Sequence, residues 1–191
     1  MTDTNTKKGP KHWIKSTLFF LLAALLLAYI LVEAFAPSQT VRIFGFKPYV
    51  VLTQSMEPKI NVDDVVIVKR PNTESLEVGD IITFSVDINN DGNDEVVTHY
   101  VYSLEYDSSM ALTIKTHPHF ENPDNITPDR WELSEDNLLG EHILTVPYIG
   151  LVIRFLQSPF GIAALAVNAA IVVGIIYLLK RDNPATSEKE K

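Results

Sequence analysis

Two long apolar runs, one near each end of the chain, constrain the fold most. The first covers residues 18–32 and continues beyond Glu33 to Ala36, and the second covers residues 160–179 without a charged residue. A helix needs about 20 apolar residues to cross the ~30 Å hydrocarbon core of a bilayer. Both runs therefore predict transmembrane helices.

The first run has an alternative interpretation as a cleavable signal peptide. Four lysines precede it, and Ala34, Phe35 and Ala36 resemble a small-x-small cleavage site. Signal peptides have a basic segment followed by an apolar stretch of about 7–15 residues. The run is longer than that stretch, which favours a membrane helix, although the small residues keep the alternative open.

Each apolar run has basic residues at the end that is nearer to a chain terminus. Four lysines precede the first run, and Lys180 and Arg181 follow the second. Because cytoplasmic flanks carry an excess of Lys and Arg, we expect a multi-pass protein of the cell membrane with both termini in the cytoplasm. The predicted organisation has cytoplasmic tails at residues 1–16 and 181–191 and membrane helices at residues 17–36 and 159–180. The domain on the outer face covers residues 37–158.

The composition of the outer segment excludes several functions. Residues 37–158 carry 8 Lys+Arg and 19 Asp+Glu, a net charge of −11. Such a surface repels nucleic acid, so we expect no nucleic-acid partner. The chain has no cysteine, which rules out disulfides, a thiolate zinc site and a cysteine nucleophile.

The outer segment is rich in short β-type runs. Val, Ile, Thr and Tyr gather in stretches separated by Gly, Asn, Asp and Pro, and we find no helix-period segment of useful length. This pattern predicts a mainly β, mostly antiparallel domain between the two membrane helices. The expected strands lie at residues 49–52, 65–68, 81–86, 96–106, 110–116 and 138–146.

Residues 87–95 have two interpretations. Their pattern D-x-N-x-D-G matches the first half of a calcium-binding loop. The twelfth position is Thr98, where such a loop needs a glutamate, and the flanks are strand-like. Asp91 and Gly92 also form a strong hairpin signal. A hairpin tip is favoured, and weak calcium binding stays as the alternative.

Ser55 is the candidate nucleophile of the outer segment. It follows the apolar run 49–52 and precedes Met56, at the start of the outer domain. A serine that cleaves an amide needs a base for its proton and donors for the oxyanion. No lysine lies where a Ser/Lys pair would require it, but His99 lies within a β run, and an imidazole is a suitable base near neutral pH.

Together these segments resemble the catalytic domain of type I signal peptidases. The resemblance is to the Ser/His subtype of endoplasmic-reticulum, archaeal and some Gram-positive enzymes, and it covers residues 45–152 together with the two-helix topology. The match is carried by an ordered set of blocks at residues 54–58, 78–84, 97–99, 123–129, 139–140 and 146–150. Tyr100 stands where the family usually has Arg, and the segment before Asp124 departs from the family pattern.

The resemblance implies a role for each candidate residue. Ser55 would be the nucleophile and His99 the general base. Asp129 would orient the histidine, with Asp124 as a supporting carboxylate or as the true orienting group. The backbone N–H of Ser55 would be the first oxyanion donor, and the second donor is not assigned.

The resemblance also implies the substrate. Signal-peptide-bearing preproteins would bind as an extended strand, with small side chains at positions −1 and −3 and residues 48–52 as one wall of the groove. The lipid bilayer would hold the site near emerging substrates. No cofactor or resident metal is expected, and protein partners are not identified.

Two further hypotheses belong to other classes. The outer domain could be a membrane-anchored β module that binds exported proteins without cleaving them. His117, His119 and Asp124 could imitate a metal site, because alternate residues of a strand share one face. A loop that happens to hold two histidines is the simpler interpretation.

Overall fold

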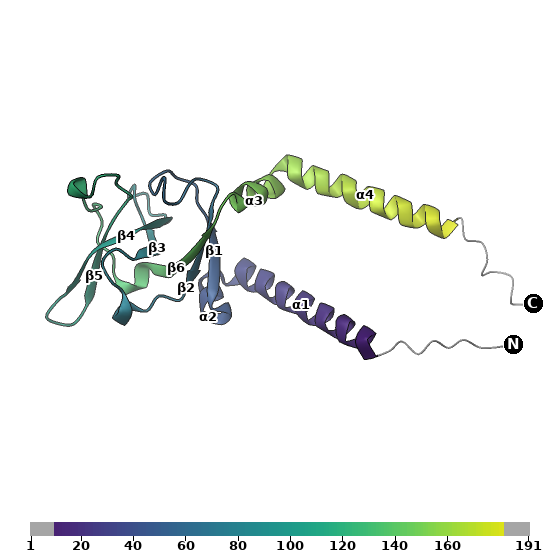
Figure 1. Ribbon diagram of the computed structural model, residues 1–191, viewed down its shortest axis with the longest axis horizontal. Helices are drawn as coiled ribbons and strands as arrows, with labels where there is room; N and C mark the ends of the chain where they lie inside the picture. Colours follow the sequence, from purple (N-terminus) through teal and green to yellow (C-terminus); the bar gives the residue numbers. More distant parts are fainter. Residues whose placement is uncertain (1–9, 182–191) are drawn as a thin grey trace, which may run out of the picture.

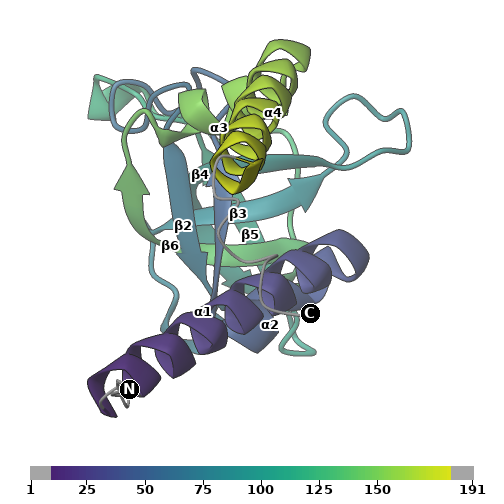
Figure 2. The ribbon, with the colours of Figure 1, turned by 90° about the vertical axis from the view of Figure 1, so that its right-hand side faces the viewer.

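The structure, a computed structural model, describes residues 10–181. Helices α1 (Pro10–Phe35) and α4 (Pro159–Arg181) leave the same side of a β domain, and their far ends lie at the same end of the molecule (Figure 1). Figure 2 shows them as separate helices in front of the sheet. Helix α1 begins inside the stretch expected to be a polar tail.

Both long helices have the composition of membrane spans. The segments Trp13–Phe35 and Pro159–Leu179 are long and apolar enough to cross a bilayer, and neither is buried inside the molecule. A helix with apolar residues all around its surface needs an apolar environment on every side. The β domain covers neither helix, so the two helices suggest membrane association.

The β domain is one six-stranded sheet in which every pair is antiparallel. This confirms the predicted fold class of a mainly β domain flanked by two helices. The strand order is β1-β2-β6-β3-β4-β5, so β1 and β5 are the edges. The strands are β1 (Phe46–Val50), β2 (Val65–Lys69), β3 (Ile81–Val86), β4 (Glu95–Tyr106), β5 (Leu112–His117) and β6 (Leu138–Val146).

Residues 87–94 connect β3 to β4 as a hairpin. Val86 pairs with Glu95, and the Asp87 carboxylate accepts the backbone N–H groups of Asp91 and Gly92. The hairpin prediction is therefore confirmed. The loop satisfies its own acidic side chains with its own amide groups.

The sheet packs two apolar clusters. The first gathers around Phe84 and Ile114 at the β3-β4-β5 end, and the second contains Met56, Ile60 and Val66 at the β1-β2 end. Met56 is 2% exposed. Because it directly follows Ser55, its burial anchors the loop that carries the candidate nucleophile.

We found no helix-period segment of useful length between the membrane helices, but the structure has two short helices there. Besides the short α2 (Thr40–Phe44), helix α3 (Ile149–Gln157) precedes α4. It has only nine residues, which is shorter than the stretch of about 11–18 residues over which a helical period can be recognised. Contacts with the nucleophile loop position it: Gly150 donates its N–H to the Asp63 carbonyl, and Arg154 pairs with the Asp63 carboxylate.

A polar cluster joins α1 to the sheet. The Glu33 carboxylate accepts the Lys47 ammonium at 2.8 Å and the Thr40 hydroxyl at 2.6 Å. Thr40 is fully buried and the Lys47 side chain is 11% exposed. These shielded, charge-assisted bonds fix β1 relative to the end of the helix.

Candidate active site

Ser55 lies in the loop between β1 and β2. The chain leaves β1 at Val50, and Val51 then exchanges backbone hydrogen bonds with Asp63 and Asp64. Ile60 donates its N–H to the Met56 carbonyl, so the loop is closed on both sides of the serine. Among the described residues, no hydrogen bond engages the backbone N–H of Ser55, which leaves this donor free for a substrate.

His99 lies in the first half of β4 and is 5% exposed. Its Nδ1 forms a 2.7 Å hydrogen bond with Asp129 Oδ2. The ring stacks on Trp131, with 6.1 Å between centroids, and Phe84 approaches it edge-on at 6.2 Å. The imidazole is thus held in one orientation by a carboxylate and two aromatic rings.

Asp129 and Asp124 occupy different environments. The Asp129 side chain is 9% exposed and faces His99, whereas Asp124 is exposed in a short 3₁₀ turn, where its backbone N–H binds Asn122. The structure therefore brings Asp129, and not Asp124, to the histidine. Asp129 Oδ2 also accepts the Thr116 hydroxyl at 2.6 Å.

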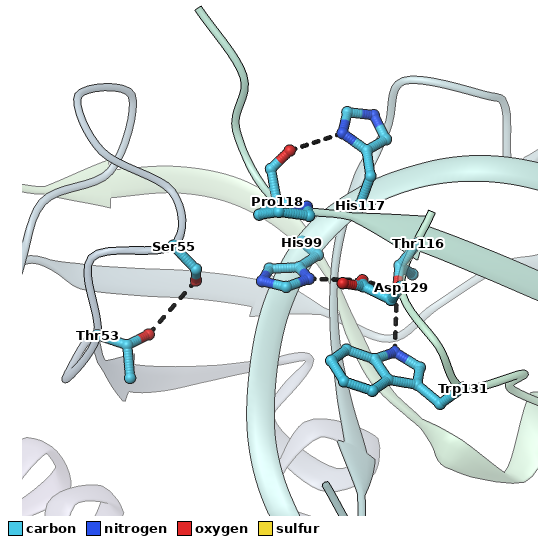
Figure 3. A network of polar contacts seen from close by, with 8 residues as sticks. All are labelled: Thr53, Ser55, His99, Thr116, His117, Pro118, Asp129 and Trp131. Carbon is cyan, nitrogen blue, oxygen red and sulfur yellow. Dashed lines mark hydrogen bonds and ion pairs between the residues drawn. The ribbon is translucent and has the colours of Figure 1, made fainter. Parts of the chain in front are cut away.

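Ser55 lies on the side of the His99 ring opposite Asp129 (Figure 3). The free ring nitrogen, Nε2, points towards the serine. Between these two described residues no hydrogen bond is formed; Ser55 Oγ instead lies 3.4 Å from the Thr53 hydroxyl. Catalytic hydrogen bonds are often long without substrate and tighten in the complex.

A pocket of about 640 Å³ connects the serine and the histidine. One wall is the segment 49–53, which leads to Ser55, and the other is the segment 95–99, which leads to His99. Since both segments end at the facing pair, they run in the same direction along the groove. Ser55, Met56, Ile60, Ile88 and Trp131 complete the lining.

Each wall includes a sheet edge that pairs with a described strand on one side only. Strand β1 is the first strand of the sheet, and β5 pairs with β4 only from Tyr100 onward, so residues 95–99 pair on the β3 side alone. Extended peptides bind such edges by adding a strand. The groove can therefore accept one extended chain between its walls.

Tyr49 keeps its wall of the groove uncharged. Burial, followed by the nearby Glu33 and Tyr29, raises the pKa of Tyr49 to about 12. The phenol is therefore neutral across the physiological range. Together with valine and leucine side chains, it favours apolar substrate groups.

The segment after β5 supports the nucleophile loop. His119 donates its backbone N–H to the Ser55 carbonyl at 2.9 Å. His117 stacks between Tyr100 and Phe120, at centroid distances of 5.3 and 6.1 Å, which fixes the course of this segment. A backbone contact of this kind leaves no signal in the sequence.

The histidines of this segment do not form a metal centre with Asp124. The His117 Nδ1–H donates to the Pro118 carbonyl at 2.6 Å. Within residues 10–181, no group of three or more His, Asp or Glu side chains is placed to hold a metal ion. The two histidines act instead through stacking and through the backbone.

A comparison with known protein families relates the first half of the chain to one of them. A family model described as signal peptidase, peptidase S26, matches residues 11–101. Over residues 11–101 the chain is similar to the signal peptidase family. The predicted resemblance to type I signal peptidases is thus confirmed at family level. The matched region includes α1 from residue 11 onward, Ser55 and His99, and it ends before Asp129. No curated protein matches the chain.

Proposed function

We propose that this protein is a signal peptidase, a membrane-bound serine endopeptidase of the Ser/His type, which removes N-terminal signal peptides from exported proteins. One observation carries the proposal: His99 binds Asp129 through one nitrogen and directs the other towards Ser55, at the end of a groove with free strand edges. The family match, over residues 11–101, supports the same class of activity.

In the proposed reaction, His99 Nε2 takes the proton of Ser55 Oγ as the oxygen attacks the scissile carbonyl. The Asp129 carboxylate stabilises the imidazolium that forms and holds the ring in the required tautomer. His99 then gives the proton to the leaving amine. Water, deprotonated by the same nitrogen, hydrolyses the acyl-enzyme and restores the serine.

Two donors are available for the oxyanion. The Ser55 N–H has no partner among the described residues, and the exposed Thr53 hydroxyl lies 3.4 Å from Ser55 Oγ. We assign Thr53 as the second donor, because its hydroxyl can turn towards an oxygen that develops beside the serine. Preorganised donors of this kind typically contribute a factor of about 10²–10³ to kcat.

The substrate would lie extended between the segments 49–53 and 95–99. Backbone hydrogen bonds to the two free edges would hold it, and alternate side chains would enter the groove. Met56, which follows Ser55 in the chain, and Ile60 are buried and line the groove. We expect small residues at positions −1 and −3 to pack against this apolar lining.

The membrane arrangement supports the same substrate class. Both helices leave one side of the β domain, which agrees with cytoplasmic termini and a catalytic domain, residues 37–158, on the outer face (Figure 1). In this arrangement residues 17–36 and 159–180 cross the bilayer. Tethering keeps the groove close to the place where a signal peptide emerges.

The deciding experiment uses the purified full-length chain in lipid vesicles and a precursor with an Ala-x-Ala site. The wild-type protein should release the mature fragment, as identified by mass spectrometry, and Ser55→Ala should not. The alternative, a β module that binds exported proteins, has one point in its favour: the absent hydrogen bond between the described residues Ser55 and His99. Precursor binding without cleavage by the wild type would establish that alternative.

A further inference from the structure

Thr116 is a fully buried hydroxyl beside the catalytic carboxylate. Its Oγ1 lies 3.1 Å from Trp131 Nε1 and 2.6 Å from Asp129 Oδ2. An indole nitrogen can only donate, so the threonine oxygen accepts that bond. The threonine proton is then directed to the carboxylate, and the direction of both bonds is fixed.

Asp129 Oδ2 accepts hydrogen bonds from two side chains. His99 Nδ1 approaches at 2.7 Å and the Thr116 hydroxyl at 2.6 Å, while the Asp129 N–H binds the Thr116 carbonyl at 2.7 Å. One residue of β5 therefore holds both the backbone and the carboxylate of Asp129. A carboxylate with two fixed donors on one oxygen has little freedom to rotate.

Trp131 connects this chain of bonds to the groove. Its ring stacks on His99, its Nε1–H binds Thr116, and it lines the pocket beside Ser55. Trp131 thus contacts the face of the His99 ring and, through Thr116, also holds the Asp129 carboxylate at the edge of that ring (Figure 3).

We propose that Thr116 and Trp131 are positioning residues for the catalytic pair His99 and Asp129. The Trp131–Thr116–Asp129 chain of hydrogen bonds sets the carboxylate in the plane that keeps His99 Nε2 directed at Ser55. Neither residue touches the scissile bond. This inference rests on the proposed function and deepens it. It names Thr116 and Trp131 as the residues that hold Asp129, which in turn orients His99.

The test compares matched substitutions in the full-length protein in vesicles. Thr116→Val keeps the shape and removes the hydroxyl, Thr116→Ser restores a hydroxyl, and Trp131→Phe keeps a ring but removes the N–H. Thr113→Val makes the same chemical change on the opposite face of β5, where the structure gives that described side chain no hydrogen bond.

We expect Thr116→Val to lower kcat by about tenfold to a hundredfold with little change in KM, which is the range expected when a hydrogen bond to a charged group is lost. Thr116→Ser should recover to within about threefold of the wild type, since the donor is restored. Trp131→Phe should lower kcat less than Thr116→Val, and Thr113→Val should match the wild type. Equal kcat in Thr116→Val and Thr113→Val would overturn the proposal.

A second readout does not depend on cleavage. With ¹⁵N-labelled histidine, the Nδ1 proton of His99 should give a downfield signal protected from exchange with water, because it is bonded to a fixed carboxylate. The signal should move upfield and exchange faster in Thr116→Val but not in Thr116→Ser. An unchanged signal in Thr116→Val would refute the positioning role. If the wild-type protein cleaves no precursor while the signal responds as expected, the proposed function fails and the positioning of His99 stands.

Discussion

His119 donates its backbone N–H to the backbone carbonyl of Ser55, with 2.9 Å between the two atoms. The bond joins the segment that follows β5 to the loop of the candidate nucleophile. Because Thr116 at the end of β5 binds Asp129, one short stretch of chain holds both ends of the proposed Ser55–His99–Asp129 arrangement.

Removing this backbone donor should therefore impair cleavage. His119→Pro lacks the N–H, whereas His119→Ala loses the side chain and keeps the N–H. A displacement of the serine by about 1 Å can cost about 10²-fold, so we expect His119→Pro to have at least tenfold lower kcat/KM than His119→Ala. The thermal midpoints of both variants show whether the domain remains folded. Equal kcat/KM in two folded variants would mean that this bond does not position Ser55.

The roles of Asp124 and Asp129 can be distinguished by removing the charge of each residue in turn. Asp129→Asn should lower kcat severely, with a loss of up to about 10⁴-fold as in other triads, because His99 loses the carboxylate that fixes its tautomer. Asp124→Asn should leave kcat close to wild type, because its exposed side chain lies away from the histidine. Steady-state cleavage of the precursor peptide measures both. A larger loss in Asp124→Asn would reverse the assignment.

Thr53 should contribute to the transition state more than to substrate binding. Thr53→Val removes the hydroxyl next to Ser55 Oγ, and we expect kcat to fall by about 10²–10³-fold while KM changes little. Thr53→Ser retains the donor and is the matched control. If Thr53→Val raises KM and spares kcat, the hydroxyl binds the ground state and is not an oxyanion donor.

The architecture could be predicted from the sequence because its signals are local. The apolar runs ending near Phe35 and Leu179, the β-branched stretches and the turn at Asp91 and Gly92 each determine their own segment. Helix α3 was missed because Ile149–Gln157 spans only nine residues, too few for a helical period to stand out in the sequence. Its position depends on contacts with Asp63, a residue far away in the chain.

The choice between Asp124 and Asp129 required tertiary structure. After β5 the chain makes an exposed turn and returns beside the strand, where Leu133 bridges to Ile114. This return brings Asp129 to His99 and leaves Asp124 in the turn. The Thr116–Trp131 bond depends on the same return, so neither residue could be recognised as part of the site from its neighbours in sequence.

His142 makes the stability of the domain pH-dependent. Burial, followed by the charge of Lys59, lowers the pKa of His142 from its usual value of 6.5. The unfolded chain therefore binds this proton at a higher pH than the folded chain does. The contribution of neutral His142 to stability is present above about pH 6.5 and is lost as the pH falls through the lower pKa of the folded state.

A denaturation series on the wild type and His142→Gln tests this assignment. Between about pH 7 and pH 5 the thermal midpoint of the wild type should fall more steeply than that of His142→Gln, which has no proton to bind at this position. Glutamine is the matched replacement, because its side chain can still hydrogen-bond Thr145, as His142 Nε2 does at 2.9 Å. If the thermal midpoints of both proteins fall in parallel as the pH decreases, other titratable groups cause the loss of stability in acid.

The central claim, that a hydroxyl and an imidazole act as one catalytic unit, is tested most directly by the single-turnover cleavage rates of Ser55→Ala, His99→Ala and the double variant. Residues that act together in one step lose nearly all of their effect when either is removed. The account predicts that all three variants share the same low residual rate. A His99→Ala rate close to wild type, or a double variant much slower than either single variant, would contradict it.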